Sequence, residues 1–396
     1  MDKPNDPVVI VGAKRTPVGA FQGQFAGVTA PQLGSVALAA AIKQAGVRGE
    51  DIDEAIFGCC LMGGLKQAPA RQAVLGAGLP TSIPCVTLTK MCGSAMKSTM
   101  IVHDEILAGT VTIGIAGGME SMTNAPFIMP SGRSGHRLGH VQIYDHMLYD
   151  GLEDAYEGKL MGVYAELCAE THGFTREAQD AFAAESVKRA QRAVNEGDFR
   201  DEIAPVKVVN HKKIETLVAD DETPGRCNIS RIPQLKAAFK EGGTVTAANS
   251  SSISDGAAAL ILMRESEALK RGIKPLARIY GHATQAQESC WFATAPVGAL
   301  KKLLEKLNWA ADDVDLYEIN EAFAVVTMFA MRELNISHDK VNVNGGACAM
   351  GHPVGATGAR IIVTLLHALK KRGLKRGIAS LCIGGGEATA LALELV

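Results

Sequence analysis

The sequence predicts an α/β protein made of two duplicated halves, with a segment of different character inserted into the first half. Runs rich in β-branched residues alternate with helix-like runs along most of the chain, which is typical of α/β architecture. Two pairs of segments align with each other in the same order. Residues 123–244 differ from the rest, because they combine loop-like stretches rich in Pro, Gly and His with long helical patterns.

The duplication rests on two alignments. ALAAAIKQAGVRGEDIDEAIFG (37–58) aligns without gaps to ALKKLLEKLNWAADDVDLYEIN (299–320), and each copy predicts a helix, a short acidic connector and a strand. GSAMKST to GGMES (93–121) parallels GATGARI to GGGEA (355–388), since both run from small residues through a helix into a strand that ends in glycines. One such match can arise by chance, but two in the same order indicate an internal repeat.

These alignments set the expected domain boundaries. We place the N-terminal half at residues 1–122 plus 245–275 and the C-terminal half at residues 276–396. Within the first half, residues 245–266 fit a buried helix or strand that leads the chain back to the core. The inserted segment, residues 123–244, is expected to form a subdomain of loops and helices.

Composition excludes several classes of partner. The 396 residues are 47% hydrophobic and 21% charged, with 40 Lys and Arg against 42 Asp and Glu. A net charge of −2 gives no reason to expect nucleic acid. The N-terminus MDKPNDPVVIVGAKRTP lacks the pattern of a secretory signal, and no apolar stretch approaches the length of a membrane span. Because the C-terminus LELV is not a peroxisomal address either, we expect a soluble, cytoplasmic protein without membrane contacts.

The nine cysteines are scattered, odd in number and free of any C-x-x-C pair. This distribution argues against a disulfide framework and against a structural zinc site, so we expect no metal. The cysteines are best interpreted as reduced thiols, most of them packed in the interior.

TLTKMCGSAMKST (87–99) places Cys92 between a strand-like run and a helix-like run. At that position the N-terminal dipole of the helix favours the thiolate. The dipole contributes about 0.3–1 kcal/mol, which is less than one pKa unit, so a base is still needed at neutral pH. From these residues alone, a buried structural cysteine remains the alternative.

NVNGGACAMGHPVGATGAR (342–360) supplies a candidate base, because it places His352 in a glycine-rich loop just before a helix. In the duplication this loop lies roughly opposite the loop that carries Cys92. Two equivalent helix starts that face each other would bring Cys92 and His352 together. A packing or surface histidine is the alternative.

SLCIGGGEATALALE (380–394) ends a strand at Cys382 and continues with three glycines. The backbone N–H groups of Gly384 to Gly386 can serve as donors to an oxyanion. A second thiol near a nucleophile and its base can act as acid and base. A buried, inert cysteine is the alternative.

EINEAFA (318–324) places Asn320 and Glu321 directly after a strand-like run. An asparagine there can hold a water molecule or a substrate oxygen. Helix N-capping is the alternative, since Asn is common at the junction between a strand and a helix.

Taken together, KMCGSAMK, NEAFA, NGGACAMGHPVGATGAR and CIGGGEA resemble, in order and spacing, the motifs of the thiolase family, which comprises acetyl-CoA acetyltransferases and 3-ketoacyl-CoA thiolases. The resemblance covers essentially the whole chain, including VIVGAKRTPVGAFQG, GGMESMTNAPF and SDGAAALILM. It implies two duplicated five-strand halves stacked as α-β-α-β-α layers, with an inserted loop domain that covers the coenzyme A site.

The resemblance also implies a role for each candidate. Cys92 would be the nucleophile that becomes acylated, and His352 would activate it and contribute to an oxyanion hole. Asn320 would orient the water that completes this hole. Cys382 would move a proton on or off the α-carbon or the leaving thiol. A second oxyanion hole would use the backbone N–H groups of Cys92 and Gly384.

For substrate binding, the resemblance implies that Ser251 approaches the pantetheine and that Met161 lines the acyl pocket. Leu160 stands where acetoacetyl-CoA enzymes often have His, which puts the acyl-chain preference in doubt. We also expect Phe292 and Phe323 to contact the substrate. Coenzyme A thioesters would be substrates, no cofactor would be needed, and the chain would form a homodimer or homotetramer.

The predicted function is therefore an acyl-CoA C-acyltransferase that condenses two acetyl-CoA to acetoacetyl-CoA plus CoA, or catalyses the reverse thiolysis, through acyl-Cys92. The alternative within the family is a longer-chain 3-ketoacyl-CoA thiolase of fatty-acid degradation. A decarboxylating condensing enzyme and an acyl-CoA-binding scaffold are further alternatives. Cys382 argues against both, because neither needs a second thiol before Gly-Gly-Gly.

Overall fold

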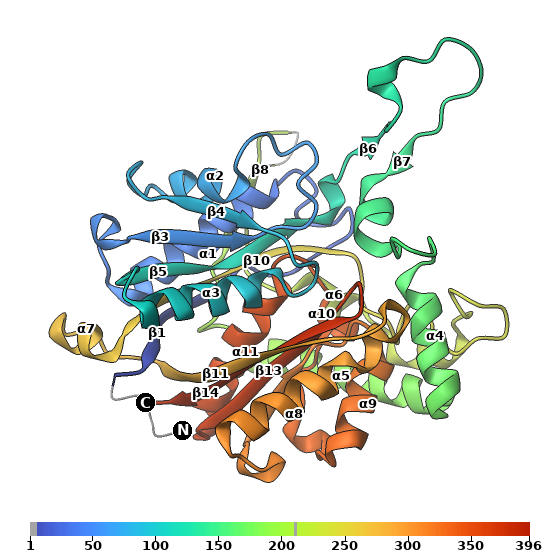
Figure 1. Cartoon of the computed structure of the whole chain (residues 1–396). Coiled ribbons are helices and arrows are strands. Elements are labelled where there is room, and N and C mark those ends of the chain that lie inside the picture. The colour runs from blue at the N-terminus through green and yellow to red at the C-terminus, as the bar shows by residue number, and fades with distance from the viewer. Residues whose placement is uncertain (1–5, 210–211) are drawn as a thin grey trace.

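The computed structural model describes residues 6–209 and 212–396 and is organised by one large mixed sheet (Figure 1). The strands of this sheet are β1 (Val8–Arg15), β2 (Gly19–Ala20), β3 (Glu54–Gly58), β4 (Cys85–Leu88), β5 (Ile113–Ser121), β10 (Ser254–Arg264), β11 (Ala277–Ala286), β12 (Leu316–Ile319), β13 (Arg376–Ile383) and β14 (Glu387–Leu395). Their order is β12-β13-β14-β11-β1-β10-β5-β3-β4, and β2 pairs with β10.

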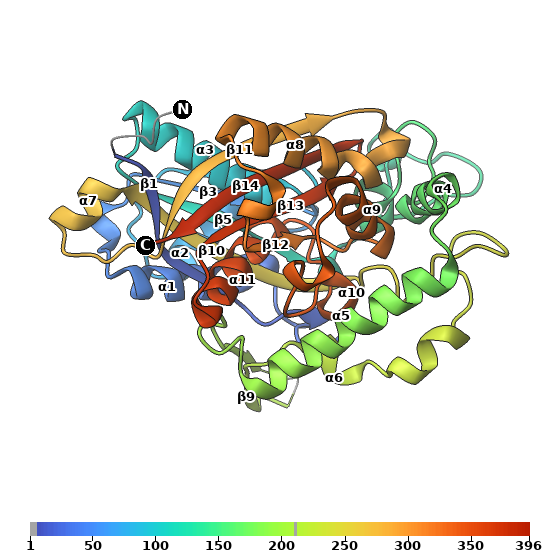
Figure 2. The same cartoon turned by 90° about the horizontal axis from the view of Figure 1, so that it is seen from below.

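The helices of the main body flank this sheet, and those of the insertion lie beside it (Figures 1 and 2). They are α1 (Ala30–Ala45), α2 (Pro69–Gly76), α3 (Ser94–Ala108), α4 (Met161–His172), α5 (Arg176–Glu196), α6 (Glu222–Arg226), α7 (Glu265–Lys270), α8 (Ala295–Leu307), α9 (Ala324–Leu334), α10 (Ala347–Met350) and α11 (Thr357–Arg372). Among the described residues, no helix is long and apolar enough to cross a bilayer.

The sheet order shows the repeat directly. Strands β1-β10-β5-β3-β4 of the first half correspond to β11-β14-β13-β12 of the second. The equivalent pairs, β3 with β5 and β12 with β13, are parallel in both halves. The halves join where β1 pairs antiparallel with β11, through Val9 with Arg278 and Ile10 with Ala277. The acidic connectors aligned in the sequence form equivalent 3-10 turns, Gly49–Asp51 and Ala311–Asp313.

The second half departs from the predicted five strands. The counterpart of β4 is reduced to a single parallel bridge between Tyr317 and Val341. The reason is local, because the side chain of Asn342 hydrogen-bonds both the N–H and the C=O of Ile319, at 2.9 and 2.8 Å. That side chain occupies the backbone groups that a further ladder pair would use.

Five layers follow from how the helices pack. Helices α3 and α11 pack against each other and lie between the two halves of the sheet, while α1 and α2 cover one outer face and α8 and α9 the other (Figures 1 and 2). Helix α11 is buried on all sides from Thr357 to Leu369, which is typical of a helix enclosed by other layers. The predicted α/β fold is thus observed, with α-β-α-β-α layering.

The segment between β5 and β10 forms α4, α5, α6 and two small hairpins, β6 (Phe127–Ile128) with β7 (Tyr144–Asp145) and β8 (Val206–Val209) with β9 (Glu215–Val218). The β6–β7 hairpin and its connecting loop project away from the body (Figure 1). Helix α5 begins after Thr175, whose side chain accepts a hydrogen bond from the N–H of Ala178. It ends at Gly197, whose φ of 72° is a left-handed cap.

Candidate active site

A single cavity of about 400 Å³ collects the predicted site residues from both halves and from the insertion. Its lining includes Cys92, Leu160, Met161, Ser251, Phe292, Phe323, His352, Cys382 and Gly384. Sequence reasoning missed much of its apolar wall, formed by Met91, Met122, Leu148, Leu152, Phe239 and Val354. Asn320 is buried and is not among the lining residues.

The turn between β4 and α3 presents Cys92 at the start of the helix. Met91 adopts a left-handed φ of 46°, which turns the chain sharply before the cysteine. The Ser94 side chain holds this turn, because its Oγ accepts a hydrogen bond from the N–H of Lys90 at 2.8 Å and donates to the Met91 carbonyl at 2.7 Å. A Cβ at Gly93 would lie 2.4 Å from Cδ1 of Ile383, so a larger residue there would require the Ile383 side chain to move.

The Cys92 sulfur is a thiol in the resting protein. Burial raises its pKa to about 11, although the backbone N–H groups of Gly384 and of Cys92 itself act in the opposite direction by hydrogen bonding to the sulfur. These two N–H groups are the ones expected to form an oxyanion hole. At neutral pH the thiol therefore needs a base within reach before it can attack.

His352 has the protonation state of such a base. Its Nδ1 lies 2.6 Å from Oγ1 of Thr357, and that hydroxyl lies 2.9 Å from the Pro353 carbonyl. The hydroxyl has one proton, which it donates to the carbonyl, so it accepts a hydrogen bond from Nδ1–H. This network assigns the proton to Nδ1 and leaves the lone pair on Nε2.

The Nε2 atom of His352 is buried and has no hydrogen-bond partner among the described residues. Burial, with a smaller contribution from the nearby positive charge of Arg360, lowers the pKa of His352 to about 3. The imidazole is therefore neutral at physiological pH. A neutral imidazole on the wall of the cavity, with a free lone pair, is suited to take a proton from a substrate or a thiol.

Cys382 lies on β13 and its side chain is buried against the same cavity. Burial raises its pKa well above the usual range, and a negative charge on Cys92 would raise it further. Because each thiolate opposes the other, only one of the two sulfurs is expected to ionise at a time. Gly385 and Gly386 follow at φ 94° and 89°, which turns the chain tightly beside Cys92 and Cys382.

Asn320 follows β12 and is 1% exposed. Neither its Oδ1 nor its Nδ2 has a hydrogen-bond partner within the described part of the chain. The N-capping alternative does not hold, because α9 begins at Ala324 with Phe323 as its N-cap. Leaving a buried amide unpaired costs about 1–3 kcal/mol, so its presence indicates a water or ligand that it binds.

Two buried carboxylates that sequence reasoning did not assign hold the loops of the site. Glu120, at the end of β5, accepts hydrogen bonds from the N–H groups of Cys60, Leu61 and Gly355, at 3.0, 3.1 and 2.8 Å. It thereby ties the loop after β3 to the loop that carries His352. No local pattern distinguishes Glu120 from other acidic residues, because the N–H groups that it accepts from lie in segments far away along the chain.

Glu321 plays the matching part in the second half. Its carboxylate accepts hydrogen bonds from Oγ of Ser186, Nδ2 of Asn342 and the N–H of Cys348, at 2.7, 2.8 and 3.0 Å. These contacts fix the start of the glycine-rich loop that leads to His352. The sequence motif shows only an acidic residue here, because its partners come from segments far away along the chain.

Comparison with known families shows to which family this fold belongs. The model of the N-terminal thiolase domain matches residues 8–266, and the model of the C-terminal thiolase domain matches residues 273–395. The chain belongs to the thiolase family. The resemblance predicted from its motifs is therefore confirmed, and so is the fold class.

Relatives of this thiolase span its full length. An acetyl-CoA acetyltransferase of Schizosaccharomyces pombe is 46% identical over 393 residues, covering 99% of this chain and 100% of the relative. Acetyl-CoA acetyltransferase 2 of Arabidopsis thaliana is 48% identical over 391 residues, covering 98% and 97%. Such similarity over whole chains places this thiolase among enzymes.

Solved structures agree with the fold described above. The acetyl-CoA acetyltransferase of Bacillus anthracis superposes with a TM-score of 0.96 at 39% identity, covering 99% of each chain. The Acat5 thiolase of Ascaris suum, solved in complex with coenzyme A, gives a TM-score of 0.93 at 39% identity, covering 98% of this chain and 100% of that one.

Proposed function

We propose that this thiolase is an acetyl-CoA C-acetyltransferase, which condenses two acetyl-CoA to acetoacetyl-CoA plus CoA and catalyses the reverse thiolysis. The observation that carries the proposal is the meeting of two thiols, a neutral imidazole and the Gly384 N–H in one largely apolar cavity. The relatives support acetyl transfer, because they are named acetyl-CoA acetyltransferases. They do not favour the longer-chain alternative.

The first half-reaction forms a thioester on Cys92. His352 Nε2 takes the thiol proton while the sulfur attacks the carbonyl carbon of acetyl-CoA, and the bond from that carbon to the CoA sulfur breaks. The CoA thiolate leaves with a proton returned by the imidazolium or by Cys382. Because neither Cys92 nor His352 is charged at rest, the proton transfer accompanies the attack of the sulfur. The acyl-Cys92 thioester then divides one difficult reaction into two easier half-reactions.

The second half-reaction forms the carbon–carbon bond. The Cys382 proton passes either to the CoA thiolate or to Nε2 of His352, so in both cases Cys382 becomes a thiolate and His352 carries a proton on Nε2. The Cys382 thiolate removes a proton from the methyl carbon of the second acetyl-CoA, and Nε2–H of His352 together with a water held by Asn320 stabilises the enolate oxygen. The enolate carbon attacks the acetyl-Cys92 carbonyl, whose oxyanion accepts hydrogen bonds from the N–H groups of Cys92 and Gly384. The Cys92 sulfur then leaves and takes the proton from Nε2 of His352, while Cys382 keeps the proton from the methyl carbon, which restores both thiols and the neutral imidazole. Each hydrogen-bond donor to an oxyanion lowers the free energy of the transition state by about 3 kcal/mol.

We propose that the two halves of the chain and the inserted segment together form the substrate-binding site. Residues 123–244 form the loop domain that covers the coenzyme A site, between an N-terminal half of 1–122 plus 245–275 and a C-terminal half of 276–396. Ser251 would contact the pantetheine, while Met161 and Leu160 face the acyl group and Phe292 and Phe323 close the wall. Coenzyme A thioesters are substrates here and no cofactor is required. A homodimer or homotetramer in the cytoplasm completes the proposal.

The test is acetoacetyl-CoA thiolysis together with mass spectrometry of the protein after brief incubation with acetyl-CoA. We expect turnover and an added acetyl group on Cys92, with both lost in Cys92→Ala. Full turnover by Cys92→Ala would contradict the mechanism. Activity with malonyl-CoA but not acetyl-CoA would favour a decarboxylating enzyme, and tight CoA binding without release of free thiol would favour a scaffold.

A further inference from the structure

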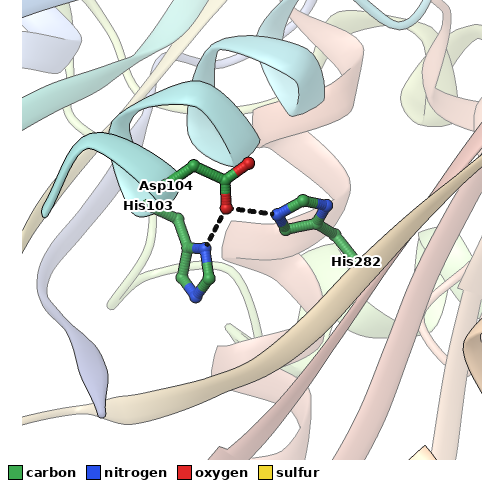
Figure 3. A group of neighbouring side chains, drawn as sticks. All are labelled: His103, Asp104 and His282. Atoms are coloured by element: carbon green, nitrogen blue, oxygen red, sulfur yellow. Dashed lines mark hydrogen bonds and ion pairs between the residues drawn. The ribbon is translucent and has the colours of Figure 1, made fainter. Parts of the chain in front are cut away.

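Three side chains outside the catalytic cavity converge at a boundary between the two halves. His103 and Asp104 lie near the C-terminal end of α3, in the first half, and His282 lies on β11, in the second (Figure 3). Nδ1 of His103 and Nε2 of His282 each lie 2.9 Å from Oδ1 of Asp104. The three potential ligand atoms all lie within 4.8 Å of one another.

We propose that His103, Asp104 and His282 form a binding site for a late first-row divalent cation, with Zn²⁺ as the representative probe. The ligand atoms are Nδ1, Oδ1 and Nε2, respectively. Imidazole nitrogen and carboxylate oxygen are ordinary ligands of Zn²⁺, and three protein ligands leave a fourth position for water. The absence of metal expected from the sequence considered only cysteines, whereas this site uses none.

Side-chain movement would bring the three ligand atoms to the spacing of a tetrahedral site. Bonds of about 2.0–2.1 Å at the tetrahedral angle place neighbouring ligand atoms about 3.3 Å apart. The two contacts of 2.9 Å therefore need to open by about 0.4 Å, which side-chain rotation of an exposed aspartate allows. The two histidine nitrogens lie within 4.8 Å of each other and must also reach about 3.3 Å. The two imidazole planes lie at 87° with centroids 5.2 Å apart, so the rings meet edge to face and direct their nitrogens to the same oxygen.

Burial gives the site a rigid side and an open side. The side chains of His103 and His282 are 8% and 13% exposed, whereas that of Asp104 is 56% exposed, so a cation and its water can approach from solvent. In the metal-free state both imidazoles donate N–H to Asp104. When a cation binds, each ring proton moves to the other nitrogen of its ring, so neutral imidazoles bind without a net loss of protons.

Two lysines oppose the cation. The positive charges of Lys97 and Lys306 already act on His282, and that of Lys306 also acts on His103, with burial as the larger cause of the lowered pKa of both histidines. These two positive charges would also repel a divalent cation bound to the three ligands. Lys306 lies exposed near the end of α8, and its Nζ donates a hydrogen bond to the His282 carbonyl at 3.4 Å. Lys306→Gln removes the positive charge, and the glutamine amide keeps a donor for that carbonyl.

The experiment measures Zn²⁺ bound by the chelator-treated full-length protein after dialysis. We expect wild type to bind about one more Zn²⁺ per chain than His282→Gln or Asp104→Asn, while His140→Gln, which alters an exposed imidazole elsewhere, binds like wild type. Zn²⁺ should also raise the thermal midpoint of wild type by a few degrees but not that of His282→Gln. Equal Zn²⁺ binding by wild type, His282→Gln and Asp104→Asn would overturn the proposal.

Two further measurements separate this site from the active-site thiols. Co²⁺ in place of Zn²⁺ should give the visible spectrum of nitrogen and oxygen ligands without a thiolate charge-transfer band, and a thiolate band unaffected by His282→Gln would contradict the proposal. Lys306→Gln should bind Zn²⁺ several-fold more tightly, and equal or weaker binding would count against it. Thiolysis by metal-free His282→Gln should match wild type, because none of the three side chains lines the catalytic cavity described here.

Discussion

Replacing Thr357 with valine tests how the site selects the tautomer of its base. The change keeps the shape of the side chain but removes the hydroxyl that accepts the Nδ1–H of His352 at 2.6 Å. Because His352 is only 6% exposed, no bulk water replaces that acceptor. The ring must either keep a buried, unpaired N–H or move its proton to Nε2, where the nitrogen can no longer act as a base.

An unpaired buried donor costs about 1–3 kcal/mol, which corresponds to a loss of about 5- to 150-fold in rate. We expect this loss in kcat and in the single-turnover rate at which acetyl-CoA acylates Cys92, with little change in KM. Rapid-quench mass spectrometry of the acetylated protein measures that rate.

Thr364→Val is the matched control, because Thr364 lies on the same helix, is buried, and donates a hydrogen bond to Glu202 at 3.1 Å, away from the cavity. This variant should lose stability without a comparable loss in the acylation rate. Acylation at the wild-type rate by Thr357→Val, or an equal loss in Thr364→Val, would refute the assigned tautomer.

Two other predictions concern buried polar groups. Asn320→Ala should lower the condensation rate at least about 10-fold while leaving the free energy of unfolding within about 1 kcal/mol of wild type, because its amide has no partner among the described residues. A large drop in the urea midpoint with normal condensation would show a structural role instead. Burial raises the pKa of Glu318 from 4.5 to about 8, against the opposing effect of Arg360. A carboxyl whose pKa is raised on folding stabilises most below its unfolded value, so wild type should lose stability as the pH rises from 4.5 to 8, and Glu318→Gln should remove this part of the pH dependence. Urea midpoints across that range check the slope, and identical slopes for both proteins would contradict it.

The sequence motifs identified the reacting side chains, and the internal repeat explained why these side chains lie close together in the folded chain. Cys92 and His352 were expected to face each other because their loops start equivalent helices, and the structure places both on the wall of one cavity with Cys382. The repeat also predicted the helix, the acidic turn and the strand that follow one another in each half. It did so because helix periodicity, capping residues and strand patterns are local properties of the sequence.

The features that could not be predicted from the sequence depend on contacts between segments that lie far apart along the chain. Glu120 and Glu321 are recognisable only as acidic residues, since their roles come from backbone N–H groups that the folded chain brings to them. The lost strand near Val341 has the same origin, because the Asn342 side chain replaces a ladder pair only once Ile319 lies beside it. The His103 and His282 cluster likewise joins residues from different halves.

The central claim is that the two thiols divide the reaction, with Cys92 carrying the acyl group and Cys382 moving the proton. Its most direct test is intact-mass analysis of Cys382→Ser mixed with acetyl-CoA, with acetoacetyl-CoA measured in the same sample. The account predicts that the acetyl group accumulates on Cys92 while acetoacetyl-CoA formation is lost. Wild-type condensation by Cys382→Ser, or an acetyl group that persists when Cys92 is also replaced by alanine, would contradict it.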